Sequence, residues 1–160
     1  MYGRIFLLCG ILAWSAGCQS ASSAGGGVIA SVVPRHMETA QFQYVGEFFT
    51  GREVADNRIL ARSQPEERTG QYFVVSLSER AAQLPPGAHA RLEIIRSDST
   101  EVRLHDFAIP RDPASAREIY LGLTGSDWPE ASLRPVAWRV RFLDGEAVIA
   151  EWPSFLWDGP

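Results

Sequence analysis

The sequence predicts an all-β protein built as an antiparallel β-sandwich of seven or eight strands. Short runs in which apolar and polar residues alternate recur through residues 40–160. Clusters rich in Gly, Pro, Ser and Asp separate these runs, and the spacing of roughly 10–18 residues is typical of two sheets packed face to face. No stretch of this region shows the 3.6-residue periodicity of an amphipathic helix. We therefore expect one β-sandwich domain over residues 40–160.

The strongest strand pattern lies in residues 133–157, which we interpret as the closing hairpin of the sandwich. Residues 138–142 and 147–152 each alternate in side-chain type, and Asp144-Gly145 lies between them as a turn. The earlier strands of the sandwich are expected to pack on this hairpin.

Two turn types would give the hairpin different registers. An Asp-Gly pair is typical of a two-residue type I′ loop, which would place Trp138 opposite Glu151. A three-residue loop over residues 143–145, with a bulge, places the apolar residues of both strands on one face. Because a one-residue slip moves every side chain of a strand to the other face, the apolar pattern favours the three-residue loop. In this register Trp138 and Trp152 belong to the core, and the arginines between the apolar residues of the first strand point to solvent.

Six earlier strands are expected from the same alternation. They cover residues 42–50, 58–62, 71–78, 88–96, 101–109 and 118–123. The strand at 88–96 should turn Ala90, Leu92 and Ile94 inward and His89, Arg91 and Glu93 outward.

The strand at 101–109 changes phase along its length. Val102 and Leu104 fit the inward pattern, whereas Phe107 does not, which predicts a bulge near His105-Asp106. After it, residues 114–117 are expected to form one helical turn.

The number and spacing of these strands resemble immunoglobulin-like sandwiches. The resemblance is architectural only, because the Cys…Trp…Cys spacing of antibody domains is absent from residues 40–160. It implies a fold and no particular ligand.

Residues 1–17 have the pattern of a signal peptide. Arg4 supplies a positive charge, and an apolar run too short to span a bilayer ends in Ser15-Ala16-Gly17-Cys18. This last segment resembles the lipobox of bacterial lipoproteins, although Leu is usual where Ser15 stands. The resemblance implies cleavage before Cys18 and lipidation of that cysteine. The alternative is an ordinary secretory signal, cut near Ala16 or Ala21.

The residues that follow Cys18 suggest how the domain is tethered. Residues 18–39 are rich in Gly, Ser and Ala in their first half and are expected to form a flexible linker. By resemblance to lipoproteins, Gln19 after the cysteine implies the outer membrane, facing the periplasm. The lipid would make the membrane a partner without a membrane-spanning helix. Cys9 lies in the signal peptide, so no disulfide is expected in the domain.

Composition and motifs exclude several classes of function. All fifteen basic residues are arginine, which rules out Schiff-base lysines. Removal of residues 1–17 leaves 14 arginines against 19 acidic residues, so no basic surface for nucleic acid is expected. Neither His105-Asp106 nor Gly125-Ser126-Asp127 has the context of a catalytic site. We expect no enzyme activity, no metal and no cofactor.

The remaining candidates for binding are aromatic residues near the predicted 124–134 loop and the C-terminus. Trp128, with Asp127 and Tyr120 nearby, and Trp157 are the candidate binding residues. Exposed aromatic rings can anchor a protein partner or stack on sugar rings. The sequence thus predicts a membrane-tethered interaction or structural module of the cell envelope, or alternatively a carbohydrate-binding module around Trp128. Its partner would be an envelope protein or a glycan, and its oligomeric state is not predicted.

Overall fold

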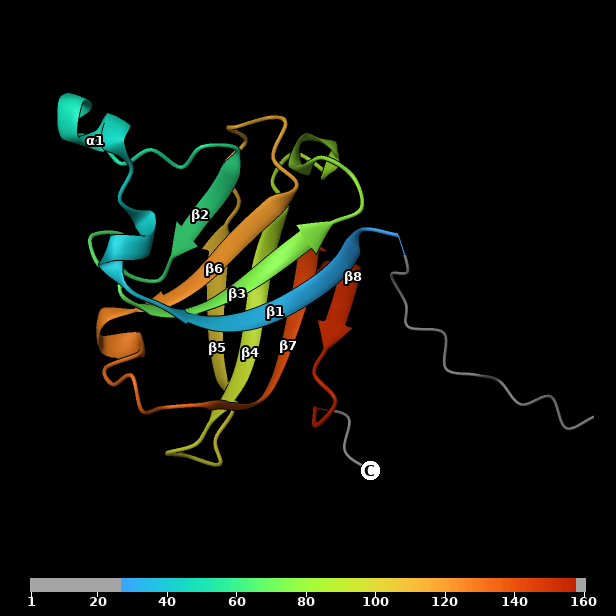
Figure 1. Cartoon of the computed structure of the whole chain (residues 1–160). Coiled ribbons are helices and arrows are strands. Elements are labelled where there is room, and N and C mark those ends of the chain that lie inside the picture. The colour runs from blue at the N-terminus through green and yellow to red at the C-terminus, as the bar shows by residue number, and fades with distance from the viewer. Residues whose placement is uncertain (1–26, 158–160) are drawn as a thin grey trace, which may run out of the picture.

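The computed structural model of the chain describes residues 27–157. The predicted signal peptide, the lipidation site Cys18 and the start of the predicted linker lie outside the described residues. Within 27–157, the chain forms eight strands in two four-stranded sheets that pack face to face (Figure 1). The predicted all-β sandwich is confirmed.

The strand order of each sheet follows from the hydrogen-bonded ladders. The first sheet has the order β1 (Ile29–Met37), β3 (Gly70–Leu77), β6 (Glu118–Thr124) and β2 (Arg58–Arg62). The second has the order β5 (Arg103–Ala108), β4 (His89–Arg96), β7 (Pro135–Asp144) and β8 (Ala147–Pro153). Five of the six ladders are antiparallel, but β2 and β6 are parallel.

The parallel ladder corrects the expectation of a wholly antiparallel sandwich, and the connection between β1 and β2 explains it. Both strands lie at edges of the first sheet. They run in the same direction, because β1 and β6 are both antiparallel to β3, and β2 is parallel to β6. Parallel strands need a crossover connection, often with a helix. Residues 38–57 supply it, and they cross the outer face of the first sheet (Figure 1).

Two predictions at the start of the domain are wrong. The predicted linker ends too late, because β1 pairs with β3 from Ile29 to Met37 and buries Ile29 and Val32 against the second sheet. The predicted first strand at 42–50 is instead a 3₁₀ turn (Thr39–Phe42) and helix α1 (Val45–Thr50). Phe42 is buried and Phe48 is exposed, so these two residues do not share one face of a strand.

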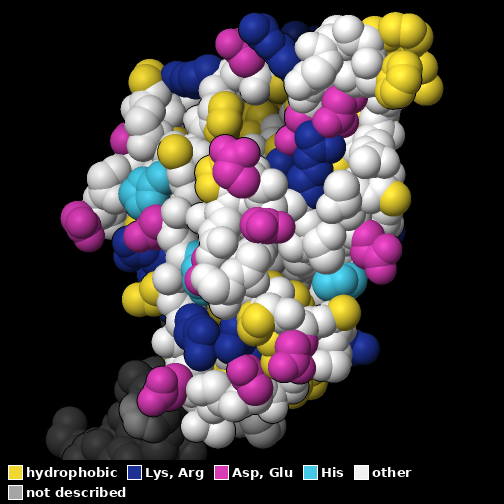
Figure 2. Space-filling model, turned by 90° about the vertical axis from the view of Figure 1, so that its left-hand side faces the viewer, with side chains coloured by type: hydrophobic (Ala, Val, Ile, Leu, Met, Phe, Trp, Pro, Cys, Tyr) yellow, Lys and Arg dark blue, Asp and Glu magenta, His cyan; other side chains and the backbone are white. Residues whose placement is uncertain are grey.

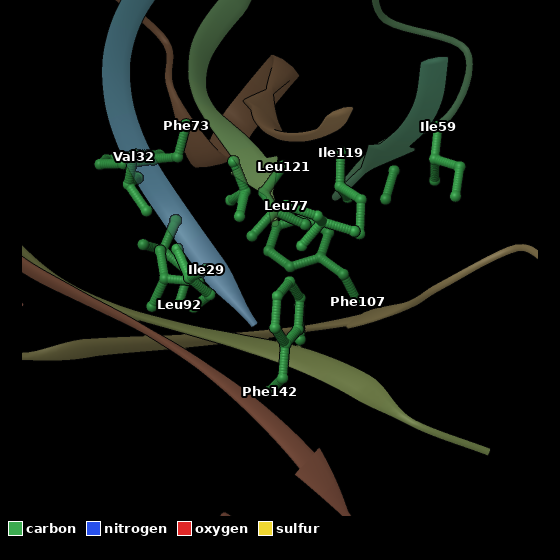
Figure 3. Packing of buried hydrophobic residues seen from close by; sticks show 14 of the residues in the cluster. Ile29, Val32, Ile59, Phe73, Leu77, Leu92, Phe107, Ile119, Leu121 and Phe142 are labelled. Carbon is green, nitrogen blue, oxygen red and sulfur yellow. The ribbon is translucent and has the colours of Figure 1, made fainter. Parts of the chain in front are cut away.

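The core lies between the sheets (Figure 3). It contains most of the residues that alternation assigned to it, together with Ile29, Val32 and Phe107, which alternation did not assign. The predicted inward faces of β3, β4 and β6 are confirmed by their buried side chains, which are Phe73, Val75, Leu77, Ala90, Leu92, Ile94, Ile119, Leu121 and Leu123. The Trp138 ring meets Phe73 edge-on, with 5.3 Å between the ring centroids. The predicted assignment of Trp138 and Trp152 to the core is confirmed, Trp152 being partly buried against it.

The hairpin keeps the predicted phase but reaches it by another turn. Asp144 pairs with Ala147, so the turn is Gly145-Glu146, and Gly145 has the positive φ of 58° that glycine adopts without strain. The register shifts beyond this pair, and Phe142 pairs with Ala150. The bulge therefore lies in β8 at Ile149, and the three-residue loop over 143–145 is wrong.

Strand β5 and the outer face of β4 differ from their predictions. The β4–β5 register is continuous, without the predicted bulge at His105-Asp106; Leu104 is exposed and Phe107 is buried. Glu93 does lie on the outer face but is only 4% exposed. The guanidinium groups of Arg139 and Arg141 cover it and bind its carboxylate, which satisfies the charge that burial would otherwise penalise.

Candidate interaction site on the β1–β2 connection

The structure separates the predicted binding residues instead of bringing them together. Trp128 is only 4% exposed and belongs to the main core, where the Arg96 guanidinium lies 5.8 Å from the centre of its ring. The same guanidinium donates a 2.7 Å hydrogen bond to the Asp127 carbonyl oxygen. Trp157 is half-buried beneath Arg139 at the other side of the second sheet. The predicted platform around Trp128 is therefore wrong, because its central ring is not accessible.

Tyr120 lies on the outer face of the first sheet, in a second and smaller apolar cluster. Met37, Phe42 and Tyr72 are its buried members, and Tyr120 packs against them with Leu60. The rings of Phe42 and Tyr72 are 4.8 Å apart. Phe42 comes from the 3₁₀ turn of the connection, so this cluster attaches residues 38–57 to the sheet.

Guanidinium groups also hold the connection to the sheet. Arg62 on β2 binds both carboxylate oxygens of Glu53, at 2.7 and 2.6 Å, and donates to the Tyr72 hydroxyl at 2.7 Å. Arg68 binds Glu47 of α1 in the same bidentate manner, at 3.0 and 2.5 Å. Such paired contacts fix orientation as well as position.

The electrostatics of this cluster follow from its contacts. The hydrogen bond from Arg62 lowers the pKa of Glu53, with the nearby charges of Arg62, Arg68 and Arg58 acting in the same direction against partial burial. Burial raises the pKa of Tyr72, so its hydroxyl stays protonated and donates to the Arg68 carbonyl oxygen at 2.7 Å. The Glu53 carboxylate, the Arg62 guanidinium and the Tyr72 hydroxyl are thus all hydrogen-bonded at neutral pH.

Helix α1, held in this way, presents apolar side chains to solvent. Phe48 is 89% exposed and Phe49 80%, and their rings meet edge-on at 5.7 Å; Val45 is exposed beside them. The helix ends at Gly51, whose φ of 64° stops it. We call Val45, Phe48 and Phe49 the aromatic knob. It stands away from the sandwich in Figure 1 and forms the hydrophobic group at the upper right of Figure 2.

A cleft of about 530 Å³ opens beside the knob, between the edges of β2 and β5. Figure 2 faces this edge of the sandwich and shows apolar side chains at the base of a hollow, with acidic and basic side chains around it. Three of the charged lining residues have partners: Arg62 binds Glu53 within the cleft, and Asp106 binds Arg91 at 2.7 and 2.9 Å. We call this hollow the edge cleft.

Of the residues considered for catalysis, Asp106 and Ser126 have side-chain hydrogen-bond partners, whereas the buried Nε2 of His105 has none. Asp106 faces Arg91 on the outer face and neighbouring His105 points the other way, as successive residues of a strand do. Burial lowers the pKa of His105. The Ser126 hydroxyl accepts a 2.5 Å hydrogen bond from the Gln64 side-chain amide. Among residues 27–157, no three His, Cys, Asp or Glu side chains are grouped as metal ligands.

Comparisons with protein-family models, with curated proteins and with solved structures find no match to this chain. In the part of the chain that the structure describes, no helix is long and apolar enough to cross a membrane.

Sequence reasoning missed the knob and the edge cleft for different reasons. Phe48-Phe49 were assigned to a strand, although two adjacent large aromatic residues just before Gly51 fit a short exposed helix equally well. The cleft depends on which strands become sheet edges, and this information does not reside in any local pattern.

Proposed function

We propose that this protein is a lipid-anchored, immunoglobulin-like domain of the bacterial cell envelope that binds a partner protein through its aromatic knob. The observation that carries the proposal is the exposure of Phe48 and Phe49 on helix α1, which Arg68 binds through Glu47. Large exposed apolar groups on a soluble domain mark interaction sites.

The strand order supports the immunoglobulin-like assignment. Strands β1, β3 and β6 occupy the positions of A, B and E in one sheet, and β5, β4, β7 and β8 those of C′, C, F and G in the other. Strand β2 takes the place of D beside E, but it arrives from the A–B connection and is therefore parallel. That substitution distinguishes this chain from the usual arrangement.

The anchor rests on Ser15-Ala16-Gly17-Cys18 and on the chain that follows it. About ten residues separate Cys18 from the start of β1, a reach of roughly 35 Å when fully extended. The domain would stay within about its own diameter of the outer membrane, in the periplasm. Mass spectrometry of the mature N-terminus tests this: we expect a lipidated Cys18, and an unmodified N-terminus would refute the anchor.

Energetics favour a partner with an apolar pocket. Burying one phenylalanine side chain contributes roughly 1.5–3 kcal/mol, so the knob can supply several kcal/mol to an interface. Arg68 binds Glu47 of α1, which limits the positions of the helix before a partner binds. The carbohydrate alternative requires an accessible Trp128, and burial of that ring removes its support.

Photo-crosslinking in cells would test the knob directly. A photoreactive amino acid at position 48 of the full chain should form adducts with one envelope protein, whereas the same residue at position 155 should not. Phe155 is the matched control because it is 94% exposed and lies far along the chain in the C-terminal turn. Adducts of equal yield at both positions, or adducts with lipid alone, would refute the proposal.

A further inference from the structure

We propose that the free edge of β2 accepts an extended segment of the partner protein, which adds a fifth strand to the first sheet within the edge cleft. This deepens the proposed function and rests on it, since it names how the partner of the knob would bind. The inference depends on three features of the cleft: its backbone edge, its paired charges and its closeness to the knob.

The direction of the β2 backbone groups follows from two hydrogen bonds. The Ser63 N–H donates to the Gly122 carbonyl oxygen of β6 at 2.8 Å. Because successive residues of a strand point their N–H groups to opposite sides, those of Leu60 and Arg62 point away from β6. Arg58, two residues earlier, agrees: its N–H bonds to the Ala55 carbonyl oxygen, outside the ladder.

No described strand pairs with this side of β2. Of the other three described sheet edges, those of β1 and β8 carry prolines that discourage pairing, whereas β5 contains none and forms the opposite side of the cleft. Strand β1 has Pro34 near its centre, and β8 ends at Pro153, where the following Ser154 N–H bonds back to the Trp138 carbonyl oxygen. Strand β2 contains no proline, and its free edge lines the cleft.

The chemistry of the cleft favours a polypeptide over a small ion. Three of its five charged lining residues, Glu53, Arg62 and Asp106, are paired within the protein. The other two, Arg58 and Asp112, carry opposite charges, so the lining does not select an ion of one sign. The base is apolar, with Ala61 from β2 and Phe107 from β5. The free edge of β2 offers backbone N–H and C=O groups to the cleft, and an extended chain complements that pattern. A strand of about five residues, roughly 17 Å long, would match β2.

The rim of the cleft contacts the residue that leads into the knob. Glu53 lines the cleft and holds Arg62, while Tyr44, which immediately precedes α1, accepts a hydrogen bond from Arg58 at the cleft rim. The knob and the free edge of β2 lie on the same face of the molecule, so one partner can contact both (Figure 2).

Peptide selection followed by amide hydrogen exchange tests the inference. The full chain, purified in detergent micelles, is panned with a displayed library of random dodecapeptides. Exchange is then measured at the amides of Leu60 and Arg62 with and without a selected peptide. We expect exchange at these two amides to slow by about tenfold or more, as for a newly formed ladder. Failure to enrich any peptide, or protection only at α1 or at another edge, would overturn the inference.

Two variants keep this test separate from that of the knob. Leu60→Pro removes one free-edge N–H and leaves the backbone groups that face β6, so it should abolish the protection of the Arg62 amide. If this variant does not fold, the wild-type exchange measurement alone tests the inference. Phe48→Ser/Phe49→Ser should leave peptide protection of β2 intact. If crosslinking at position 48 fails but the β2 amides are protected, the proposal that the knob binds a partner is refuted and the strand site on β2 stands. If crosslinking succeeds but the β2 amides are not protected, only the strand site is refuted.

Discussion

Between the two sheets, Phe73, Leu92 and Phe142 are completely buried among apolar neighbours. By contrast, one buried phenylalanine and a few guanidinium contacts hold residues 38–57 on the outer face of the first sheet. Both regions are ordered, but different interactions order them. The sandwich depends on area removed from water, which is insensitive to pH, whereas the connection depends on charged pairs.

This difference has a consequence for function. An element held by few contacts can open locally without unfolding the domain. The sandwich therefore serves as the rigid support, and the connection with its knob is the part that conditions can loosen. The variants below test this division, beginning with the largest expected effect.

Removing a core ring should destabilise the whole domain. Phe142→Ala leaves a cavity between the sheets and should lower the free energy of unfolding by about 3–5 kcal/mol. Urea unfolding followed by tryptophan fluorescence measures it. Phe155→Ala removes a ring that is exposed and should change stability by less than about 0.5 kcal/mol. Equal losses in both variants would contradict the described core.

Breaking the Arg62–Glu53 contact should loosen the connection first. Arg62→Met leaves Glu53 and the Tyr72 hydroxyl without their donor, and we expect a loss of about 1.5–3 kcal/mol in the local stability of residues 38–57. Hydrogen exchange of that segment is the measurement. Arg91→Met is the control, because its partner Asp106 is about half exposed and solvent screens the pair, so exchange in residues 38–57 should stay unchanged. If exchange in β3 and β4 rises as much as in the connection, the division into two regions is wrong.

Acid should separate the two regions in the same order. The pKa of Glu53 is lower in the folded protein than in the unfolded chain, so the ion pair stabilises the connection at neutral pH. That stabilisation is lost as the pH falls below the ordinary glutamate value of about 4.3. Limited proteolysis across this range should therefore cut residues 43–57 before the sandwich unfolds. Simultaneous loss of both would argue against independent opening, and Arg62→Met should remove the pH dependence.

The smallest effect is expected within the sandwich itself, at His105. Burial lowers its pKa, so the unfolded chain takes up a proton more readily than the folded one. Stability should then decline slightly as the pH falls from 7 to 5, through the ordinary histidine value of about 6.5. Urea titrations of wild type and His105→Gln measure it, and an unchanged slope in the variant would refute this origin.

Local patterns predicted the parts of the fold that repeat over a few residues. Phe73, Val75 and Leu77 alternate because one face of β3 meets the other sheet, and period-2 burial is visible in any such strand. The same logic failed at Phe42 and Phe48, where alternation arose by coincidence in a helical connection. Strand β1 was missed because small residues and Pro34 gave its sequence the composition of a linker.

The candidate site was less predictable than the fold. The polar loop around Trp128 predicted an exposed ring, but Arg96 covers this ring and it packs in the main core. Glu93 suggested a solvated position, but two arginines from β7 bury it. In each case a residue distant in sequence decided the environment, and no neighbouring residue carried that information.

By itself, the sequence determined that this chain forms strands, that β3, β4 and β6 turn alternate side chains into the core, and that the domain needs no disulfide. These follow from the alternation of side chains and from composition, which act locally. Only the tertiary structure decided that β2 is a free parallel edge, that Trp128 is buried and that Phe48 and Phe49 are exposed. The reason is physical: exposure and edge position depend on which distant segments pack together, and the side chains of one segment do not specify its neighbours.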